Sequence, residues 1–533
     1  MISLGIEGTA HTISCGIVDD TRVLSNFSKT YHNPAGGIHP REAAVHHSEN
    51  VKDVIMNALS SANLTLADID IISFSRGPGL GPCLRVVATA ARTLAIKGGK
   101  PLIGVNHPLG HVEIGRKVTG ALDPIMLYVS GGNTQIISHW AGRYRVLGET
   151  MDIGIGNMLD KLGRDLGFPF PGGPQIEKLA SKGDKLLDLP YSVKGMDTSF
   201  SGIYTAAKEY LRKGKSKEDV CFSVQEYSFA MLLEVLERGL HQTSKDEILL
   251  AGGVAKNLRL KEMLSSLSSD LGIRAYLTAD QYCMDNGAMI AEAGRLMHES
   301  GYRIEIAAST VDQRFRIDQV DVPWIPANRN MVSENRGAES VIEVQPYLGR
   351  DSIRKTRVSK TYRNPELDRR IRIERLRNEV SLILRSRDAG IPVPVVYDID
   401  SESCSAVYER IRGSTLRTRL ASKICKDDVT GQLGEYVARL HSNGMTHGDL
   451  TCSNILVSEE GIPYLIDTSM GKADSEVEDM AVDLYLLRES LNSVSDRPET
   501  LMDKFKNSYS SVFSRWSEVL DAVNELEKRR RYV

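Results

Sequence analysis

Glycine-rich turns that directly follow apolar strands constrain the fold of the first half of the chain. "YVSGGNTQ" and "LLAGGVAKN" each carry a short apolar run into a glycine pair, and "FSRGPGLGP" carries one into a Gly/Pro loop. Glycine has no Cβ, so the backbone N–H groups of such turns can approach a phosphate or a ribose closely. Three turns of this design predict one nucleotide cleft between two αβ halves.

A pattern of a different kind lies near the end of the chain. In "MTHGDLTCSN", Asp449 precedes Asn454 by five residues, as in the catalytic loop of protein kinases. We predict that Asp449 takes or orients a hydroxyl proton and that Asn454 binds nucleotide-bound Mg²⁺. Four further candidates follow in kinase order: Gly337 in "ENRGAES" for the glycine-rich loop, Lys355 in "SIRKTRV" for the phosphates, Glu379 on the next helix, and Asp467 in "YLIDTS" for the metal.

This kinase pattern departs from most kinases in ways that limit its function. His-Gly-Asp lacks the arginine that normally reads a phosphorylated activation loop. Few residues separate Asp467 from "EDMAVDLY", and no Ala-Pro-Glu follows. The sequence therefore predicts a small kinase fold without a phosphorylation-switched loop or a peptide platform. A scaffold that only senses nucleotide is the alternative for this half.

Net charge does not mark the chain as a nucleic-acid binder, but two local segments are basic. The 533 residues carry a formal net charge of −3, so no global field favours a polyanion. Between Arg350 and Arg377, however, eleven Lys/Arg face four Asp/Glu, and the chain ends "EKRRRYV". A charge run is usually a solvated surface. Two basic segments in the same half of the chain are nevertheless a reason to test for an anionic partner.

Cysteine usage and hydropathy indicate a reducing compartment. The seven cysteines are scattered and form no CxxC pair, which fits reduced thiols better than a disulfide or zinc framework. The start "MISLGIEGTA" is too short in its apolar run for a signal peptide, and no apolar window is long enough to span a membrane. We therefore predict a cytoplasmic protein with no membrane partner.

A metal-ligand spacing occurs in "NHPLGHVEIG". His107 and His111 are four residues apart, and Pro108 suits the first turn of a helix, so both side chains would project from one face. Asp285 in "YCMDNGAMIA" is a candidate carboxylate ligand, and Tyr128 could add a phenolate. Two unrelated helix histidines are the alternative. Pro108 stands where a zinc protease of the HExxH type has its glutamate, which argues against a peptidase.

Motifs in both halves resemble known families. "GIEGTAHT", "HPREAAVHHSE", "RGPGLGPCLRVV", "YVSGGNTQ", "FPGGPQIEKLA" and "MDNGAMIA" resemble the universal tRNA threonylcarbamoyladenosine-synthesis transferase family over about Met1 to Phe315. "KTYRNPELDRRIRIERLRNE" and "HGDLTCSNIL" resemble the atypical small kinase/ATPase of the KEOPS complex over roughly Glu334 to Val533. The chain therefore looks like a natural fusion of two neighbouring KEOPS subunits, which is an archaeal habit.

The resemblance implies an α/β fold in two parts. A two-lobed domain like actin and sugar kinases, with a duplicated ribonuclease-H-like core, is expected over 1–322. A linker is expected over 323–335, where Asn and Ser are frequent and periodicity is absent. A small bilobal α+β kinase domain is expected over 336–533.

The resemblance also implies a reaction and its residues. The family transfers threonylcarbamoyl from threonylcarbamoyl-adenylate to the exocyclic amine of the adenosine after the anticodon, in tRNAs reading codons that begin with A. His107, His111, Tyr128 and Asp285 would hold one divalent metal, with Fe(II) favoured over Zn(II), and the kinase half would bind ATP with Mg(II) and act on serine or threonine. The expected adenylate-binding residues are Tyr128, Val129, Ser130, Gly131, Gly132, Asn133, Asp160, Gly173, Glu177, Gly252, Gly253 and Asn257.

The implied partners are tRNA, a separate synthase that supplies threonylcarbamoyl-adenylate, and small KEOPS subunits. The runner-up function is a carbohydrate kinase of the same fold, with a scaffold kinase domain. That enzyme would use the glycine turns for ATP and one acidic base, and it would not need His107 and His111.

Overall fold

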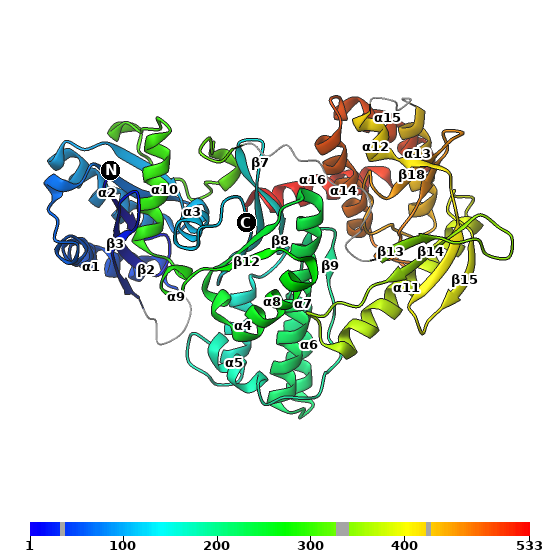
Figure 1. Cartoon of the computed structure of the whole chain (residues 1–533), viewed down its shortest axis with the longest axis horizontal. Helices are drawn as coiled ribbons and strands as arrows, with labels where there is room; N and C mark the ends of the chain where they lie inside the picture. Colours follow the sequence, from blue (N-terminus) through cyan, green and yellow to red (C-terminus); the bar gives the residue numbers. More distant parts are fainter. Residues whose placement is uncertain (32–37, 327–339, 423–427, 533) are drawn as a thin grey trace. The chain divides into compact units, whose positions relative to one another are not determined.

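The computed structural model of the chain describes residues 1–31, 38–326, 340–422 and 428–532 (Figure 1). The chain divides into two compact units. Unit 1 comprises Met1–Ser333 and Thr361–Arg363, and unit 2 comprises Glu334–Lys360 and Asn364–Val533. Among the helices in these ranges, none is both long enough and apolar enough to cross a membrane.

Unit 1 contains two sheets with the same topology. The first has the strand order β3-β2-β1-β4-β5 and the second the order β8-β7-β6-β11-β12. In each sheet the central strand pairs antiparallel on one side and parallel on the other. The strands are β1 (Ser3–Glu7), β2 (Thr12–Val18), β3 (Val23–Thr30), β4 (Ile71–Gly77), β5 (Leu102–Asn106), β6 (Ile125–Val129), β7 (Thr134–Trp140), β8 (Arg143–Glu149), β11 (Glu247–Ala251) and β12 (Arg274–Leu277), with a short ribbon of β9 (Val193–Lys194) and β10 (Asp197–Thr198).

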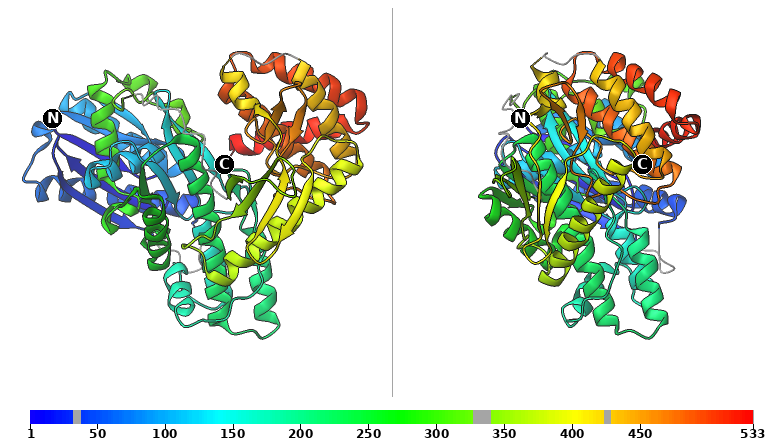
Figure 2. Two further views of the ribbon diagram at one scale, coloured as in Figure 1. Left: turned by 45° about the vertical axis from the view of Figure 1, so that its right-hand side comes forward. Right: turned by 90° about the vertical axis from the view of Figure 1, so that its right-hand side faces the viewer.

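Helices cover both faces of these two sheets. The helices are α1 (Pro40–Ser61), α2 (Gly81–Gly98), α3 (His107–Thr119), α4 (Ile155–Asp165), α5 (Gly173–Ala180), α6 (Ser201–Arg212), α7 (Lys217–Thr243), α8 (Leu258–Leu271), α9 (Asp280–Cys283) and α10 (Gly287–Glu299), with 3₁₀ turns η1 (Leu66–Asp68), η2 (Gly253–Lys256), η3 (Ile306–Ala308) and η4 (Ile317–Gln319). The helices form three layers around the sheets. Helices α1 and α2 pack on the first sheet, α3 and α10 lie between the two sheets, and α7 packs on the second sheet (Figure 1; Figure 2). The apolar faces of the strands pack against these helices in two buried clusters, which is the layered αβ solution expected for such strands.

Close backbone packing fixes α10 against the first sheet. A Cβ on Gly16 of β2 would lie 2.2 Å from Ala288 N, and one on Gly287 would lie 2.1 Å from Gly16 N. Only glycine permits this approach. The Gly287 N–H also donates to Ser14 Oγ at 2.8 Å. Because Asp285 lies two residues before α10, this packing fixes the position of Asp285 relative to the first sheet.

Unit 1 also contains the short segment Thr361–Arg363. Tyr362 and Arg363 are buried there. The Arg363 guanidinium donates to Glu234 at 2.8 Å, and the Tyr362 hydroxyl donates to Glu237 at 3.2 Å. Both carboxylates lie on α7, so this segment is joined to unit 1 by buried charged hydrogen bonds.

Unit 2 has the two-part layout of a small kinase fold. Its first part is a sheet with the order β13-β14-β16-β15 and the helix α11, and its second part is helical with the ribbon β17-β18-β19. An apolar cluster runs through the helical part. The elements are β13 (Ser340–Val344), β14 (Ser352–Arg357), α11 (Pro365–Asp388), β15 (Val396–Asp400), β16 (Ser405–Glu409), β17 (Gly413–Thr415), α12 (Leu416–Ala421), α13 (Asp428–Ser442), β18 (Ile455–Ser458), β19 (Pro463–Leu465), α14 (Val477–Val494), α15 (Pro498–Val512) and α16 (Trp516–Tyr532).

The predicted fold class is confirmed in both halves. The duplicated topology of unit 1 is the two-lobed arrangement expected from the glycine turns and the resemblance. The domain boundaries at 322 and 336 stay predictions. Most of the expected linker 323–335 and the candidate Gly337 lie outside the described residues.

Candidate metal centre and nucleotide sites

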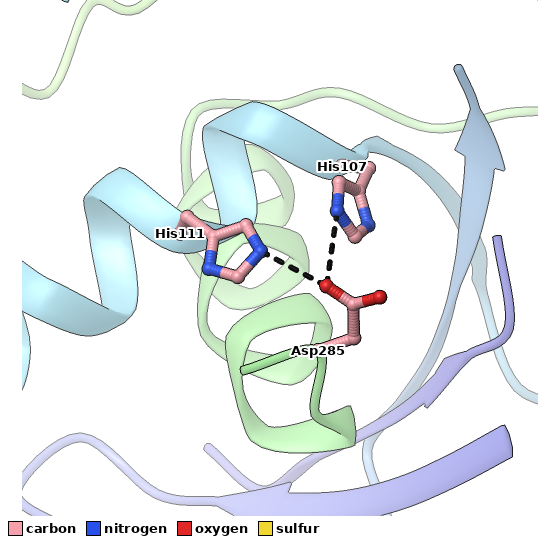
Figure 3. Close-up of side chains that lie close together, drawn as sticks. All are labelled: His107, His111 and Asp285. Atoms are coloured by element: carbon pink, nitrogen blue, oxygen red, sulfur yellow. Dashed lines mark hydrogen bonds and ion pairs between the residues drawn. The ribbon is translucent and has the colours of Figure 1, made fainter. Parts of the chain in front are cut away.

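The structure brings His107, His111 and Asp285 together (Figure 3). Asn106 caps α3 by accepting from Leu109 N at 3.1 Å, and Pro108 lies in the first turn. The helix therefore begins at His107, and His111 follows one turn later on the same face. One oxygen of Asp285, Oδ1, lies 3.4 Å from His107 Nε2 and 3.3 Å from His111 Nε2.

This arrangement fits a divalent cation. One donor atom from each of the three residues lies within 4.8 Å of the other two. His107 and His111 are buried, with 5 % and 1 % of their surface exposed, and Asp285 reaches solvent. Two imidazole nitrogens and one carboxylate oxygen, with open positions, are donors that suit Fe(II) or Zn(II).

Charge at this cluster favours a cation. Burial alone would raise the pKa of Asp285, but His107 and His111 outweigh it and hold that pKa well below its usual value. Burial would likewise lower the pKa of His107, but Glu7 and Asp285 outweigh it and raise that pKa well above its usual value. The negative field that holds a proton on His107 would also attract a metal ion.

Tyr128 lies beside the cluster as the sequence predicted. It is the penultimate residue of β6, is buried, and its ring centroid is 4.8 Å from that of His111. Burial raises the pKa of its phenol. Its role as a metal donor stays a prediction.

Two of the three glycine turns meet at the start of α4. The loop Ser130–Asn133 closes on itself through Ser130 N and Asn133 O at 2.8 Å. Its carbonyls accept from α4: Gly156 N donates to Ser130 O at 3.1 Å, and Asn157 N donates to Gly131 O at 2.9 Å. Gly252 has a φ of +100°, and a Cβ there would lie 2.2 Å from Val129 O. The turn at Gly252–Gly253 therefore packs directly on the end of β6, where the loop Ser130–Asn133 begins.

The third turn does not join this pair. A Cβ on Gly79 would lie 2.7 Å from Thr9 O, and Leu80 N donates to the same carbonyl at 2.8 Å. Thr9 in turn lies 3.2 Å from His107. The Gly/Pro loop therefore supports the metal cluster rather than the loop Ser130–Asn133.

The other predicted adenylate residues hold neighbouring elements. Asp160 on α4 accepts from Gly172 N at 2.8 Å, and burial raises its pKa. Glu177 on α5 accepts from Leu258 N at 2.7 Å. Asn257 caps α8 and donates to Gln225 at 3.0 Å, so both ends of its amide are engaged within the protein. A Cβ on Gly173, which begins α5, would meet no atom within 4 Å. Their contacts with a nucleotide stay predictions.

The predicted kinase residues form a charged cluster in unit 2. Lys355 Nζ lies 2.8 Å from Glu379 Oε1 and 2.9 Å from Asp467 Oδ1. Burial alone would lower the pKa of Lys355, but Asp467 and Glu379 outweigh it and raise that pKa. Asn454 Nδ2 donates to Asp449 Oδ2 at 2.9 Å. The predicted lysine, glutamate and aspartate thus lie together, and their contacts with ATP and Mg²⁺ stay predictions.

The structure explains the glycine in His-Gly-Asp. Gly448 has a φ of +79°, and a Cβ there would lie 2.1 Å from Met470 O. Both its N–H and that of His447 donate to Asp483, at 2.8 and 2.7 Å. An arginine at position 448 would need this loop to be rebuilt.

Sequence reasoning missed three residues near these sites. Glu7 and Thr9, at the end of β1, contact His107. An acid at the end of a short, fully buried strand was a signal that could have revealed Glu7. Arg357, two residues after Lys355 on the same face of β14, also pairs with Glu379, and strand alternation could have predicted it.

His47 beside this region predicts a pH dependence of stability. Burial, aided by His46 and His11 and opposed by Glu7, lowers the pKa of the His47 imidazole to about 4. Between pH 6.5 and 4 the unfolded chain then binds more protons at this residue, so stability falls as pH falls. We expect a loss of up to about 3 kcal/mol across this window. The His47→Asn variant should flatten that slope in denaturant titrations, whereas His39→Asn, at an exposed site, should not. An unchanged slope in His47→Asn would contradict the assignment.

Comparisons with known proteins match both halves. Residues 22–292 match a family model described as tRNA N6-adenosine threonylcarbamoyltransferase, and residues 329–509 match the lipopolysaccharide kinase (Kdo/WaaP) family. A Thermoplasma acidophilum protein named "Probable bifunctional tRNA threonylcarbamoyladenosine biosynthesis protein" is 54% identical over 533 residues, covering 100% of both chains. The chain belongs to this bifunctional family.

Members of the bifunctional family occur in other archaeal groups. The Methanocaldococcus jannaschii relative of the same name is 43% identical over 543 residues, again covering 100% of both chains. Among solved structures, HypF from T. kodakarensis has a TM-score of 0.43 and 14% identity, covering 56% of this chain and 48% of that chain. Membership of the bifunctional family confirms that the chain is a natural fusion.

Proposed function

We propose that unit 1 transfers threonylcarbamoyl from threonylcarbamoyl-adenylate to the exocyclic amine of the adenosine that follows the anticodon, in tRNAs reading codons that begin with A. The observation that supports this most is the cluster in which Asp285 Oδ1 lies between His107 Nε2 and His111 Nε2. A carbohydrate kinase of this fold has no need of such donors, whereas a transferase that must polarise an acyl carbonyl does.

In this transfer, some residues of unit 1 would bind the metal ion and others the leaving phosphate. His107, His111 and Asp285, with Tyr128 as a further donor, would hold the cation, which when bound would polarise the acyl carbonyl as a Lewis acid. The N–H groups of the glycine turns would receive the phosphate of the leaving AMP. The adenosine amine forms the new C–N bond as the C–O bond to AMP breaks, and the amine loses a proton.

Positioning would outweigh general-base catalysis in this reaction. An amine attacks an activated acyl group without a strong base, so the barrier falls mainly through orientation and charge stabilisation. Asp160 and Glu177 would hold the ribose hydroxyls, and Asn257 would lie near the adenine. We propose Fe(II), with Zn(II) as the alternative metal, which elemental analysis of protein purified without chelator would decide.

We propose that unit 2 binds ATP with Mg(II) and works as an ATPase and serine/threonine kinase that supports the complex. Lys355 would hold the phosphates, Asn454 and Asp467 the metal, and Asp449 the acceptor hydroxyl. The exposed Arg350, Arg369 and Arg377 would meet tRNA phosphates, whereas Lys355, Arg357 and Arg363 are held in buried ion pairs within the protein. Small KEOPS subunits and a separate threonylcarbamoyl-adenylate synthase would complete the pathway.

The test is transfer to tRNA of defined sequence. Threonylcarbamoyl-adenylate labelled in the threonine would be supplied with unmodified tRNA and the small subunits. We expect label in tRNA that carries adenosine after the anticodon and none in the same tRNA with guanosine there. Equal labelling of both tRNAs, or of neither, would contradict the proposed function.

A further inference from the structure

We propose that Glu7 and Thr9 fix the proton of His107 on Nδ1 and thereby make His107 the stronger of the two imidazole ligands. This inference concerns a positioning pair outside the predicted site, and it rests on the proposed metal centre of unit 1. The two histidines look equivalent in sequence, but under this proposal they differ in how strongly each binds the metal ion.

The hydrogen bonds of Glu7 leave one oxygen for His107. Glu7 is fully buried. Its Oε1 accepts from Thr9 N at 2.7 Å and from the Thr9 hydroxyl at 2.6 Å. Its Oε2 lies 3.2 Å from His107 Nδ1. The carboxylate is thus held by Thr9 and presents its second oxygen to the imidazole ring.

The direction of these contacts places a hydrogen on Nδ1 of His107. The Thr9 hydroxyl has one hydrogen, and the short contact with Glu7 Oε1 uses it. At 3.2 Å from His107 Nδ1, the same hydroxyl oxygen can therefore only accept. Neither of the two oxygens near Nδ1 has a hydrogen to give, so Nδ1 carries one and donates it to Thr9, while the Glu7 carboxylate forms an ion pair beside it. Nε2, the atom that faces Asp285, is then the nitrogen that would give up its hydrogen to bind a metal ion.

His111 has no such support. Its Nδ1 is buried, and no residue in the described part of the chain forms a hydrogen bond with it. A ligand histidine that donates to a carboxylate is oriented and made more basic, and losing that partner typically costs 10–100-fold in metal affinity. The fold thus supplies this effect at His107 and omits it at His111.

The segment that carries Glu7 is held rigidly. Gly8 N donates to Ser75 Oγ at 3.2 Å, and a Cβ on Gly8 would lie 2.5 Å from Val87 Cγ2. Thr9 O accepts from Leu80 N at 2.8 Å. Glu7 meets the Nδ1 side of the His107 ring while Asp285 meets the Nε2 side. Glu7 is therefore a partner of the ligand and does not itself reach the point shared by the three donors.

Zinc binding by the full chain tests the proposal. Metal-free wild type, Glu7→Gln and Thr9→Val would be titrated with Zn²⁺ against a chelator, and the stoichiometry at saturation measured by elemental analysis. We expect Glu7→Gln to bind one Zn²⁺ per chain with about 10–100-fold weaker affinity. Thr9→Val should weaken binding less, and Thr9→Ser should restore it. Glu149→Gln, which changes another buried carboxylate at the end of a strand, should bind as wild type does.

Other outcomes separate the proposal from its premise. Wild-type affinity in Glu7→Gln would overturn the proposal. Loss of the bound Zn²⁺ even at saturation would also overturn it, by making Glu7 a direct ligand. If wild type and His111→Ala bound Zn²⁺ equally, the proposed metal centre itself would be contradicted. ¹⁵N and ¹H shifts of labelled histidine in the zinc-loaded protein give a readout independent of activity. The Nδ1–H signal of His107 should shift between wild type and Glu7→Gln while that of His111 stays unchanged, and identical spectra would contradict the role of Glu7.

Discussion

His111→Ala is expected to reduce bound divalent metal to well below one equivalent per chain and to lower threonylcarbamoyl transfer by at least about 100-fold. His111 supplies one of three donors that meet at one point, and its Nε2 lies 3.3 Å from Asp285 Oδ1. Losing a partner of a ligand already costs 10–100-fold in affinity, so losing a ligand should cost more. Elemental analysis and a labelled-transfer assay on the same preparation would measure both effects.

The matched control is His298→Ala, which removes a partly buried histidine on α10 outside the cluster. It should keep metal and transfer at wild-type levels. Unchanged metal stoichiometry in His111→Ala would show that the cluster is not the metal centre. Loss of transfer with metal retained would place the role of His111 in substrate contact instead.

Asp449→Asn is expected to slow ATP turnover by unit 2 about 10²–10⁴-fold, the range typical of a lost general base. The substitution keeps the size of the side chain, and Asn454, which donates to Asp449 Oδ2 at 2.9 Å, stays in place. Only the carboxylate charge is removed, so nucleotide binding should change little. Phosphate release and a nucleotide-binding titration would separate the two quantities.

Asp388→Asn, at the exposed end of α11, is the control for Asp449→Asn. It removes one carboxylate charge from the same unit and should leave turnover unchanged. Metal in unit 1 should be the same in both variants. ATP turnover that survives Asp449→Asn would favour the nucleotide-sensing scaffold, and loss of unit 1 metal would mean that the two activities are not separable.

Local patterns in the sequence were enough to predict the elements that carry the sites. The four-residue spacing of His107 and His111 required only that "NHPLGHVEIG" be a helix, and Asn106 and Pro108 are its start signals. The glycine turns after β6 and β11 were predicted because glycine following an apolar run is a local signal. In unit 2, Lys355 and Glu379 were likewise predicted from local patterns, the first from a strand and the second from the helix that follows it.

Long-range packing could not be predicted in this way. Asp285 reaches His107 because α10 lies directly on β2, through a contact between Gly16 and Gly287 that no local pattern encodes. The Gly/Pro loop looked like a third nucleotide turn, but it packs on Thr9 instead. Asp483, which holds the His-Gly-Asp loop from α14, could not be predicted either, because its partners in that loop are backbone N–H groups.

The most direct test compares threonylcarbamoyl transfer by wild type, His111→Ala and Asp449→Ala, with supplied threonylcarbamoyl-adenylate, unmodified tRNA and the small subunits. The proposed function predicts that the first round of transfer is lost in His111→Ala and retained in Asp449→Ala. Transfer retained in His111→Ala and lost only in Asp449→Ala would contradict it and give the kinase unit the governing role.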